Sequence, residues 1–281
     1  MFSSVQSKNF KAVPYLETSQ LMQSHQGLVS FSLLRPNVVV GPNGAGKSAL
    51  LTALSLATLS FFTGDSALDG HYVGLSSDDF WTHEGWRTSE QHFLQGLELG
   101  ASDLGAAIYF RPNHIPGNEE MIASSMMTGY FDKAREYGRM VKEKSSGQGG
   151  QARLAQMHDV LAGRIRPEYG VINWRGPIKP VKFENPYQAC AYEHQCNVLR
   201  ERVTAIKSAE VTPIPVALLD EPEQSLDARA ELELWKAIES ANVDNLQVIV
   251  ATHSLYPVMH PEKFHIIEAV PGYLKSVRDL L

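Results

Sequence analysis

Runs of consecutive apolar residues and stretches of helical apolar spacing alternate near both ends of this 281-residue chain. Continuous apolar runs are typical of strands that a parallel sheet buries on both faces. Apolar runs of this kind predict strands at 38–40, 214–219 and 246–251, the last interrupted by Gln247. A fourth strand is predicted at 265–270, where apolar pairs flank Glu268. Helical patterns follow the first two of these strands, at 48–62 and 228–241. The pattern therefore predicts an α/β fold, with a core of mostly parallel sheet and flanking helices.

The segments between these elements are less regular. Apolar groups at 10–15 and 28–34 predict edge strands that lead into the first buried strand. Apolar groups at 93–99 and 106–110 predict two antiparallel strands. The remaining helical patterns lie at 119–144, 152–165 and 187–209. Beside the parallel core we therefore expect an antiparallel β part and a helical subdomain.

We expect these parts to form one composite domain. Its parts are an N-terminal lobe at 1–118, a helical subdomain with an insertion at 119–212, and a C-terminal lobe at 213–281. No apolar run of about eighteen residues occurs, so no membrane span is expected. The polar segment Met1–Lys11 has no signal-peptide core. Cys190 and Cys196 lie six residues apart and are expected to be reduced thiols, which suits the cytoplasm.

A glycine-rich motif directly follows the first buried strand. It reads Gly41-Pro42-Asn43-Gly44-Ala45-Gly46-Lys47-Ser48, the full G-x-x-x-x-G-K-[ST] phosphate loop. Backbone amides and the positive end of the following helix hold phosphates in such a loop. Lys47 would place its charge between the β- and γ-phosphates, and the Ser48 hydroxyl would ligate Mg²⁺. The motif, with the adjoining Ala49, predicts a site for ATP or another nucleoside triphosphate.

Two later buried strands end in polar side chains. The strand at 214–219 leads into Asp220 and Glu221, and adjacent carboxylates repel each other unless a cation is present. We expect Asp220 to hold Mg²⁺ and Glu221 to orient and deprotonate the attacking water. The strand at 246–251 leads into His253, which can donate a hydrogen bond to the γ-phosphate. Together with Lys47, Glu221 and His253 are the predicted catalytic residues.

These motifs, in this order, resemble those of the ATP-binding-cassette (ABC) ATPase superfamily. The segments similar to its Walker A, Walker B, D-loop and switch-histidine motifs are Gly41–Ser48, Val216–Glu221, Ser225–Asp227 and Thr252–Ser254. The run Ser145-Ser146-Gly147-Gln148 resembles the family's signature motif, with Ser146 in place of the first glycine. The motif Asp-Glu-Pro-Glu-x-x-Leu-Asp at 220–227 resembles the corresponding motif of stand-alone bacterial ABC ATPases. The types that it resembles are those of repair, of overcoming lysogenization defect and of anti-phage defence.

The resemblance implies ATP hydrolysis with Mg²⁺ in a head-to-tail homodimer. The signature of one protomer would cap the ATP held by the other, so the ATP-binding set would also include the residues Ser145, Ser146, Gly147, Gln148 and Asp227. The helix after the signature would point its N-terminus at the γ-phosphate, where its dipole is favourable. The γ-phosphate would then lie between two protomers.

The chain departs from the family pattern in two places. The 72-residue gap between Gln148 and Asp220 is long for the family, so 163–208 is interpreted as an insertion. We expect it to contact a partner; the alternative is that its aromatic side chains cover the domain's own core. No clear Q-loop glutamine is present, and the positions that would fit are Gln91, Gln95 and the segment 80–83. For the adenine-stacking aromatic, Tyr15 is one interpretation, and a buried edge-strand tyrosine is the alternative.

Three functions fit these features. The first is an ATPase that controls a partner protein, such as a nuclease or toxin effector in anti-phage defence. The second is a DNA-engaging repair ATPase, although the net charge of −6 gives no indication of nucleic acid as the main ligand. The third, a motor subunit of a membrane transporter, is disfavoured by the missing Q-loop and the Ser-Ser signature.

Overall fold

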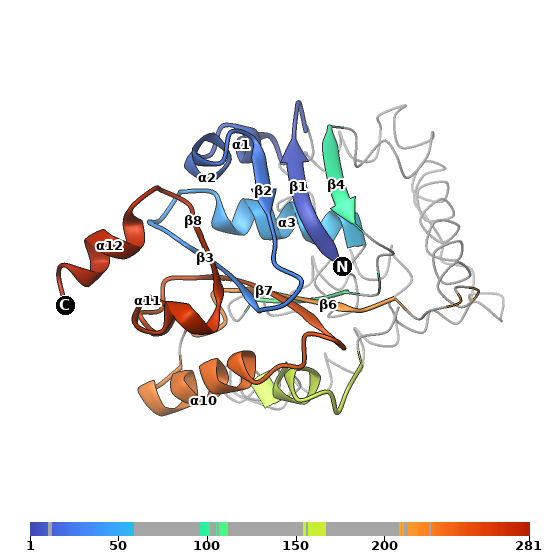
Figure 1. Ribbon diagram of the computed structural model, residues 1–281, viewed down its shortest axis with the longest axis vertical. Helices are drawn as coiled ribbons and strands as arrows, with labels where there is room; N and C mark the ends of the chain where they lie inside the picture. The colour runs from blue at the N-terminus through green and yellow to red at the C-terminus, as the bar shows by residue number, and fades with distance from the viewer. Residues whose placement is uncertain are drawn as a thin grey trace, which may run out of the picture.

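The computed structural model describes most of both ends of the chain. The described residues are 1–10, 13–58, 96–101, 105, 107–111, 154–155, 157–166, 208, 210, 213–224 and 226–281. In this part of the chain the strands form one five-stranded and one three-stranded sheet, with helices packed around them (Figure 1). No helix within these residues is both long and apolar enough to cross a membrane.

The five-stranded sheet is parallel throughout and has the order β5-β6-β7-β3-β8. Its strands are β3 (Asn37–Val40), β5 (Ala107–Phe110), β6 (Val216–Asp220), β7 (Gln247–Thr252) and β8 (His265–Glu268). Four of them, β3, β6, β7 and β8, confirm the strands predicted at 38–40, 214–219, 246–251 and 265–270. Because β3, β7 and β6 are parallel, the loops that follow them leave the same edge of the sheet, and because β7 lies between the other two, these loops are neighbours.

Helices cover both faces of this sheet, which explains why β3, β5, β6 and β7 are buried at every position. Side chains at alternate positions, such as Val39 and Leu218, pack with α3 (Lys47–Thr58) on one face. Their neighbours, such as Val38, pack with α10 (Ala228–Glu239) on the other. Figure 1 shows α3 and α10 on opposite sides of the parallel strands. Both helices were predicted, and α3 is described as far as Thr58.

The three-stranded sheet is antiparallel and has the order β2-β1-β4. Its strands are β1 (Phe2–Ser7), β2 (Leu28–Ser30) and β4 (Leu97–Ala101). The prediction of an edge strand within 28–34 is confirmed by β2. The prediction that 93–99 and 106–110 form two antiparallel strands is wrong for the second segment. There β5 joins the parallel sheet, and all four of its residues are buried, as a strand covered on both faces requires.

The predicted edge strand at 10–15 is also wrong. The chain instead turns into two short helices, α1 (Pro14–Glu17) and α2 (Gln20–Ser24). Pro14 has no amide hydrogen and a fixed φ, which suits the first turn of a helix. Ser19 caps α2, because its hydroxyl oxygen accepts a hydrogen bond from the Met22 amide at 3.2 Å.

The α1–α2 segment packs against the glycine-rich loop. The Leu21 amide donates a hydrogen bond to the Ala45 carbonyl at 3.0 Å. At Gly46, where φ is +101°, a Cβ atom would collide with Ser19 Cβ and lie 2.6 Å from Ser19 Oγ. Gly46 therefore serves both the backbone conformation of the loop and its close contact with Ser19.

The chain ends in α11 (Tyr256–Met259), a 3₁₀ turn (Pro261–Lys263), β8 and α12 (Tyr273–Arg278). Residues 157–161 are helical, in agreement with the pattern at 152–165, and Met157 and Leu161 pack in the core beside α10. The predicted helix at 119–144 and both cysteines lie outside the described residues.

Two glycine substitutions separate these effects on stability. Gly44 also has a positive φ, of +74°, but a Cβ atom there would have no neighbour within 4 Å. We expect Gly44→Ala to lower the free energy of unfolding by about 1–2 kcal/mol through backbone strain. Gly46→Ala should cost a further ~1–3 kcal/mol, because Ser19 must also move. Urea unfolding without nucleotide measures both, and equal losses would contradict the close packing on Ser19.

Candidate functional site

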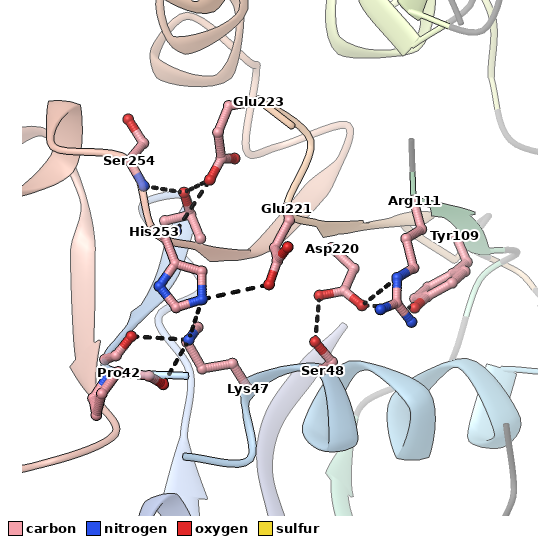
Figure 2. Close-up of polar contacts among 12 residues, drawn as sticks. Pro42, Lys47, Ser48, Tyr109, Arg111, Asp220, Glu221, Glu223, His253 and Ser254 are labelled. Atoms are coloured by element: carbon pink, nitrogen blue, oxygen red, sulfur yellow. Dashed lines mark hydrogen bonds and ion pairs between the residues drawn. The ribbon is translucent and has the colours of Figure 1, made fainter. Parts of the chain in front are cut away.

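Polar side chains gather where four neighbouring strands end. The glycine-rich loop follows β3, Asp220 and Glu221 lie at the end of β6, His253 follows β7, and Arg111 follows β5. Figure 2 shows these side chains facing one another above the start of α3. The carboxyl edge of a parallel sheet is where open α/β folds bind ligands. The structure therefore brings together the residues predicted from the loop and from both later strand ends.

Lys47 lies at the centre of this cluster and is buried. Its Nζ donates to the carbonyls of Gly41 at 2.9 Å and Pro42 at 3.0 Å, and lies 2.9 Å from His253 Nε2. Burial lowers the pKa of Lys47, while the negative charges of Glu221 and Asp220 act in the opposite direction. The ammonium group thus lies under the loop, facing the residue that follows β7.

His253 is a neutral imidazole in this arrangement. Burial lowers its pKa first, and the positive charge of Lys47 lowers it further. An ammonium group can only donate hydrogen bonds, so Nε2 must accept the one from Lys47. The histidine proton then lies on Nδ1.

Asp220 is the deepest group of the site, with its side chain 0% exposed. Its Oδ1 accepts a hydrogen bond from Ser48 Oγ at 2.8 Å, and its Oδ2 accepts one from the Tyr109 hydroxyl at 2.9 Å. Arg111 Nε lies 3.7 Å from the same Oδ2. Burial raises the pKa of Asp220, and the Arg111 charge is the largest effect opposing it. Both oxygens of this buried carboxylate are therefore held in place.

The pair Ser48 and Asp220 fits a magnesium ion that arrives with a nucleotide. Both groups offer hard oxygen atoms, and these atoms lie side by side at the start of α3. In the part of the chain that the structure describes, no three His, Cys, Asp or Glu residues form a metal-binding group. Mg²⁺ suits such a partial site, because it usually takes one or two protein ligands and completes its shell with phosphate and water.

Glu221 differs from Asp220 in backbone and in exposure. It adopts φ of +48°, which is uncommon for a residue with a side chain, and its amide donates to the Ala251 carbonyl at 2.8 Å. Its side chain is 26% exposed, and Oε1 lies 3.4 Å from His253 Nε2. The turn thus places one carboxylate in the interior and the next where water can reach it.

Several predicted residues have structural roles that the pattern did not show. Ala45 and Ala49 are buried in the core, so only their backbone can face a ligand. Asp227 is the N-cap of α10, since its carboxylate accepts the amides of Arg229 and Ala230, both at 2.9 Å. Its contact with ATP stays a prediction.

Tyr15 lies on a helix and is 50% exposed, so the alternative of a buried edge-strand tyrosine is wrong. Partial burial raises the pKa of Tyr15, while the positive charge of Arg111 acts in the opposite direction. Adenine stacking by this ring stays a prediction.

The predicted signature and Q-loop positions lie outside the described residues, as does most of the proposed insertion. These positions are Ser145, Ser146, Gly147, Gln148, Gln91, Gln95 and 80–83. Conversely, the structure adds Tyr109 and Arg111, which the sequence did not single out, and Glu223, which belongs to the motif Asp-Glu-Pro-Glu-x-x-Leu-Asp but had no assigned role. For Arg111 the sequence offered one signal, its place directly after the apolar segment 106–110, where a strand would end.

No model of a known protein family matches this chain, and no curated protein matches it. What the site does must therefore be inferred from its own residues.

Proposed function

We propose that the chain is an ABC-type ATPase with a P-loop core, which binds ATP with Mg²⁺ and hydrolyses it. One observation supports this most strongly. Ser48 and Asp220 are separated by 172 positions in sequence and share a hydrogen bond, while Lys47 meets His253 across 206 positions. A phosphate loop, a buried carboxylate, a partly exposed carboxylate and a neutral histidine thus lie together at one sheet edge.

In this proposal the loop binds the phosphates. The first amides of α3, those of Lys47 and Ser48, have no acceptor within their own helix and can donate to phosphate oxygens. Lys47 would exchange its two carbonyl partners for the β- and γ-phosphates. Ser48 and Asp220 would hold Mg²⁺, which would supply positive charge to the phosphates.

Glu221 is the proposed general base. It takes a proton from a water molecule, whose oxygen attacks the γ-phosphorus while the bond between that phosphorus and the ADP oxygen breaks. Asp220 cannot take this role, because both of its oxygens are engaged and it has no access to water. When the γ-phosphate draws Lys47 away, His253 Nε2 no longer has to accept a hydrogen bond from the ammonium group. The neutral imidazole can then take the tautomer with its proton on Nε2, which can donate a hydrogen bond to a phosphate oxygen.

We further propose a head-to-tail homodimer that controls a partner protein in the cytoplasm, with an effector of anti-phage defence as the favoured class. These steps rest on the motif resemblance and on residues beyond the described part of the chain. The alternatives of a DNA-engaging ATPase and a transporter motor depend on those same residues, and nothing in the described part favours either.

Removing the loop lysine tests nucleotide binding. We expect Lys47→Ala to weaken the affinity for Mg-ATP at least about a hundredfold, or roughly 2.8 kcal/mol, because the buried ammonium is the main charge facing the phosphates. Isothermal titration calorimetry measures this affinity. The matched control is Lys263→Ala, which removes an exposed lysine paired with Glu239 and should leave the affinity unchanged. Equal affinities for both variants would contradict the proposed phosphate site.

Replacing the proposed base should separate binding from turnover. Glu221→Gln keeps the side-chain shape but cannot accept the proton, so hydrolysis should fall by about 10²–10⁴-fold with ATP affinity retained. Single-turnover assays with radiolabelled ATP check this. Glu233→Gln makes the same change on the exposed face of α10 and is the control. Hydrolysis by Glu221→Gln at the wild-type rate would refute the assignment of the base.

The proposed dimer can be detected with the same variant. Glu221→Gln should hold ATP without consuming it, so light scattering should show a doubled mass with Mg-ATP and a monomer mass with Mg-ADP. The reason is that one protomer leaves the γ-phosphate open to water, and a second helix N-terminus would cover it. A strictly monomeric protein at micromolar concentration, with bound ATP demonstrated, would count against this arrangement.

A further inference from the structure

A third glutamate joins the two loops that carry Glu221 and His253. Glu223 lies two residues beyond Glu221, in the loop after β6. Its Oε1 accepts a hydrogen bond from Thr252 Oγ1 at 2.6 Å and another from the His253 amide at 3.0 Å. Figure 2 shows this carboxylate above the end of β7, on the side of His253 away from Lys47. One oxygen atom thus binds the two residues where β7 ends and its loop begins.

Both ends of this link are anchored further. On the β6 side, the Gln224 amide donates a hydrogen bond to the Glu221 carbonyl at 3.0 Å, which closes a turn that contains Glu223. On the β7 side, Thr252 Oγ1 accepts the Ser254 amide at 2.9 Å, and Ser254 Oγ donates to Glu231 Oε1 at 2.5 Å. The loop after β7 is thereby tied to both the loop after β6 and helix α10.

The environment of Glu223 does not suit a base or a metal ligand. Its Oε1 is already engaged twice, and its Oε2 is buried with no hydrogen-bond partner among the described residues. Burial raises the pKa of this carboxyl group. A buried carboxylate with one unpaired oxygen costs desolvation free energy and adds little net stability. The burial of Glu223 is therefore better explained by how this carboxylate positions Thr252 and His253 than by any gain in stability.

We infer that Glu223 is a positioning residue, which fixes His253 relative to Glu221 and Lys47. This inference rests on the proposed function. The distances from His253 Nε2 to Lys47 Nζ, 2.9 Å, and to Glu221 Oε1, 3.4 Å, depend on where the backbone of residue 253 lies. Glu223 holds that backbone from the loop that also carries Glu221. Its loss should therefore disturb the reacting geometry while the glycine-rich loop continues to bind nucleotide.

Three substitutions at this position test the inference. Glu223→Gln keeps an oxygen acceptor at the same reach, so it should hydrolyse ATP within about threefold of wild type. Glu223→Ala removes the acceptor, and Glu223→Asp keeps the charge but shortens the reach. Both should lower kcat at least tenfold and leave the Kd for Mg-ATP within threefold, because misplacement at a reacting centre affects the transition state more than ground-state binding. Glu233→Gln, on the exposed face of α10, is the control and should leave both kcat and Kd unchanged.

A second measurement needs no nucleotide. Hydrogen exchange of the His253 amide should be at least tenfold faster in Glu223→Ala and Glu223→Asp than in wild type, and unchanged in Glu223→Gln. Should Glu223→Ala fail to fold, the comparison of Asp with Gln decides the question.

Two outcomes would overturn the inference: unchanged kcat in the Ala and Asp variants, or a kcat for Gln as low as that for Ala. If wild type neither binds nor hydrolyses ATP, the proposed function fails. The exchange data then still show whether Glu223 holds the loop after β7.

Discussion

The hydrogen bond between Ser48 and the buried carboxylate of Asp220 is the contact on which the arrangement of the site depends. It joins the start of α3 to the end of β6, and it forms because β7 lies between β3 and β6 in a fixed parallel register. In that register Val40 pairs with Thr252, and Asp220 pairs with Ala251. A shift of one residue would turn each side chain to the opposite face of the sheet and take Asp220 away from α3. Packing on both faces holds the register, so the site is a consequence of the core.

The charges within this frame are divided between two regions. Arg111 and Tyr109 engage the Asp220 oxygen that faces away from Ser48, so the buried carboxylate has its own cation. Lys47 instead contacts two carbonyl groups and a neutral imidazole, which leaves its charge for an anionic ligand. Such a division is what the proposed function requires, since the phosphates and the buried carboxylate would otherwise compete for the same ammonium group.

Support for the site also comes from segments that carry none of its predicted chemistry. The α1–α2 segment contacts the glycine-rich loop from outside through Ser19 and Leu21. The turn after β6 holds the loop after β7 through Glu223. In both places a backbone that would otherwise be free to move is hydrogen-bonded or closely packed against a neighbour. Precise positioning of reacting groups depends on supporting contacts of this kind.

The sequence by itself determined the elements whose signal is local. Mostly apolar segments predicted β3, β6, β7 and β8, because a strand in the core needs apolar side chains. The spacing of Gly41, Lys47 and Ser48 predicted the loop, because a tight turn before a helix requires particular residues. Tertiary structure decided what depends on distant partners. These include the pairing of β5 with β6 and the contacts of Arg111 and Glu223. A strand's neighbour and a charged side chain's partner depend on contacts between segments that are far apart in the chain, and no short pattern contains that information.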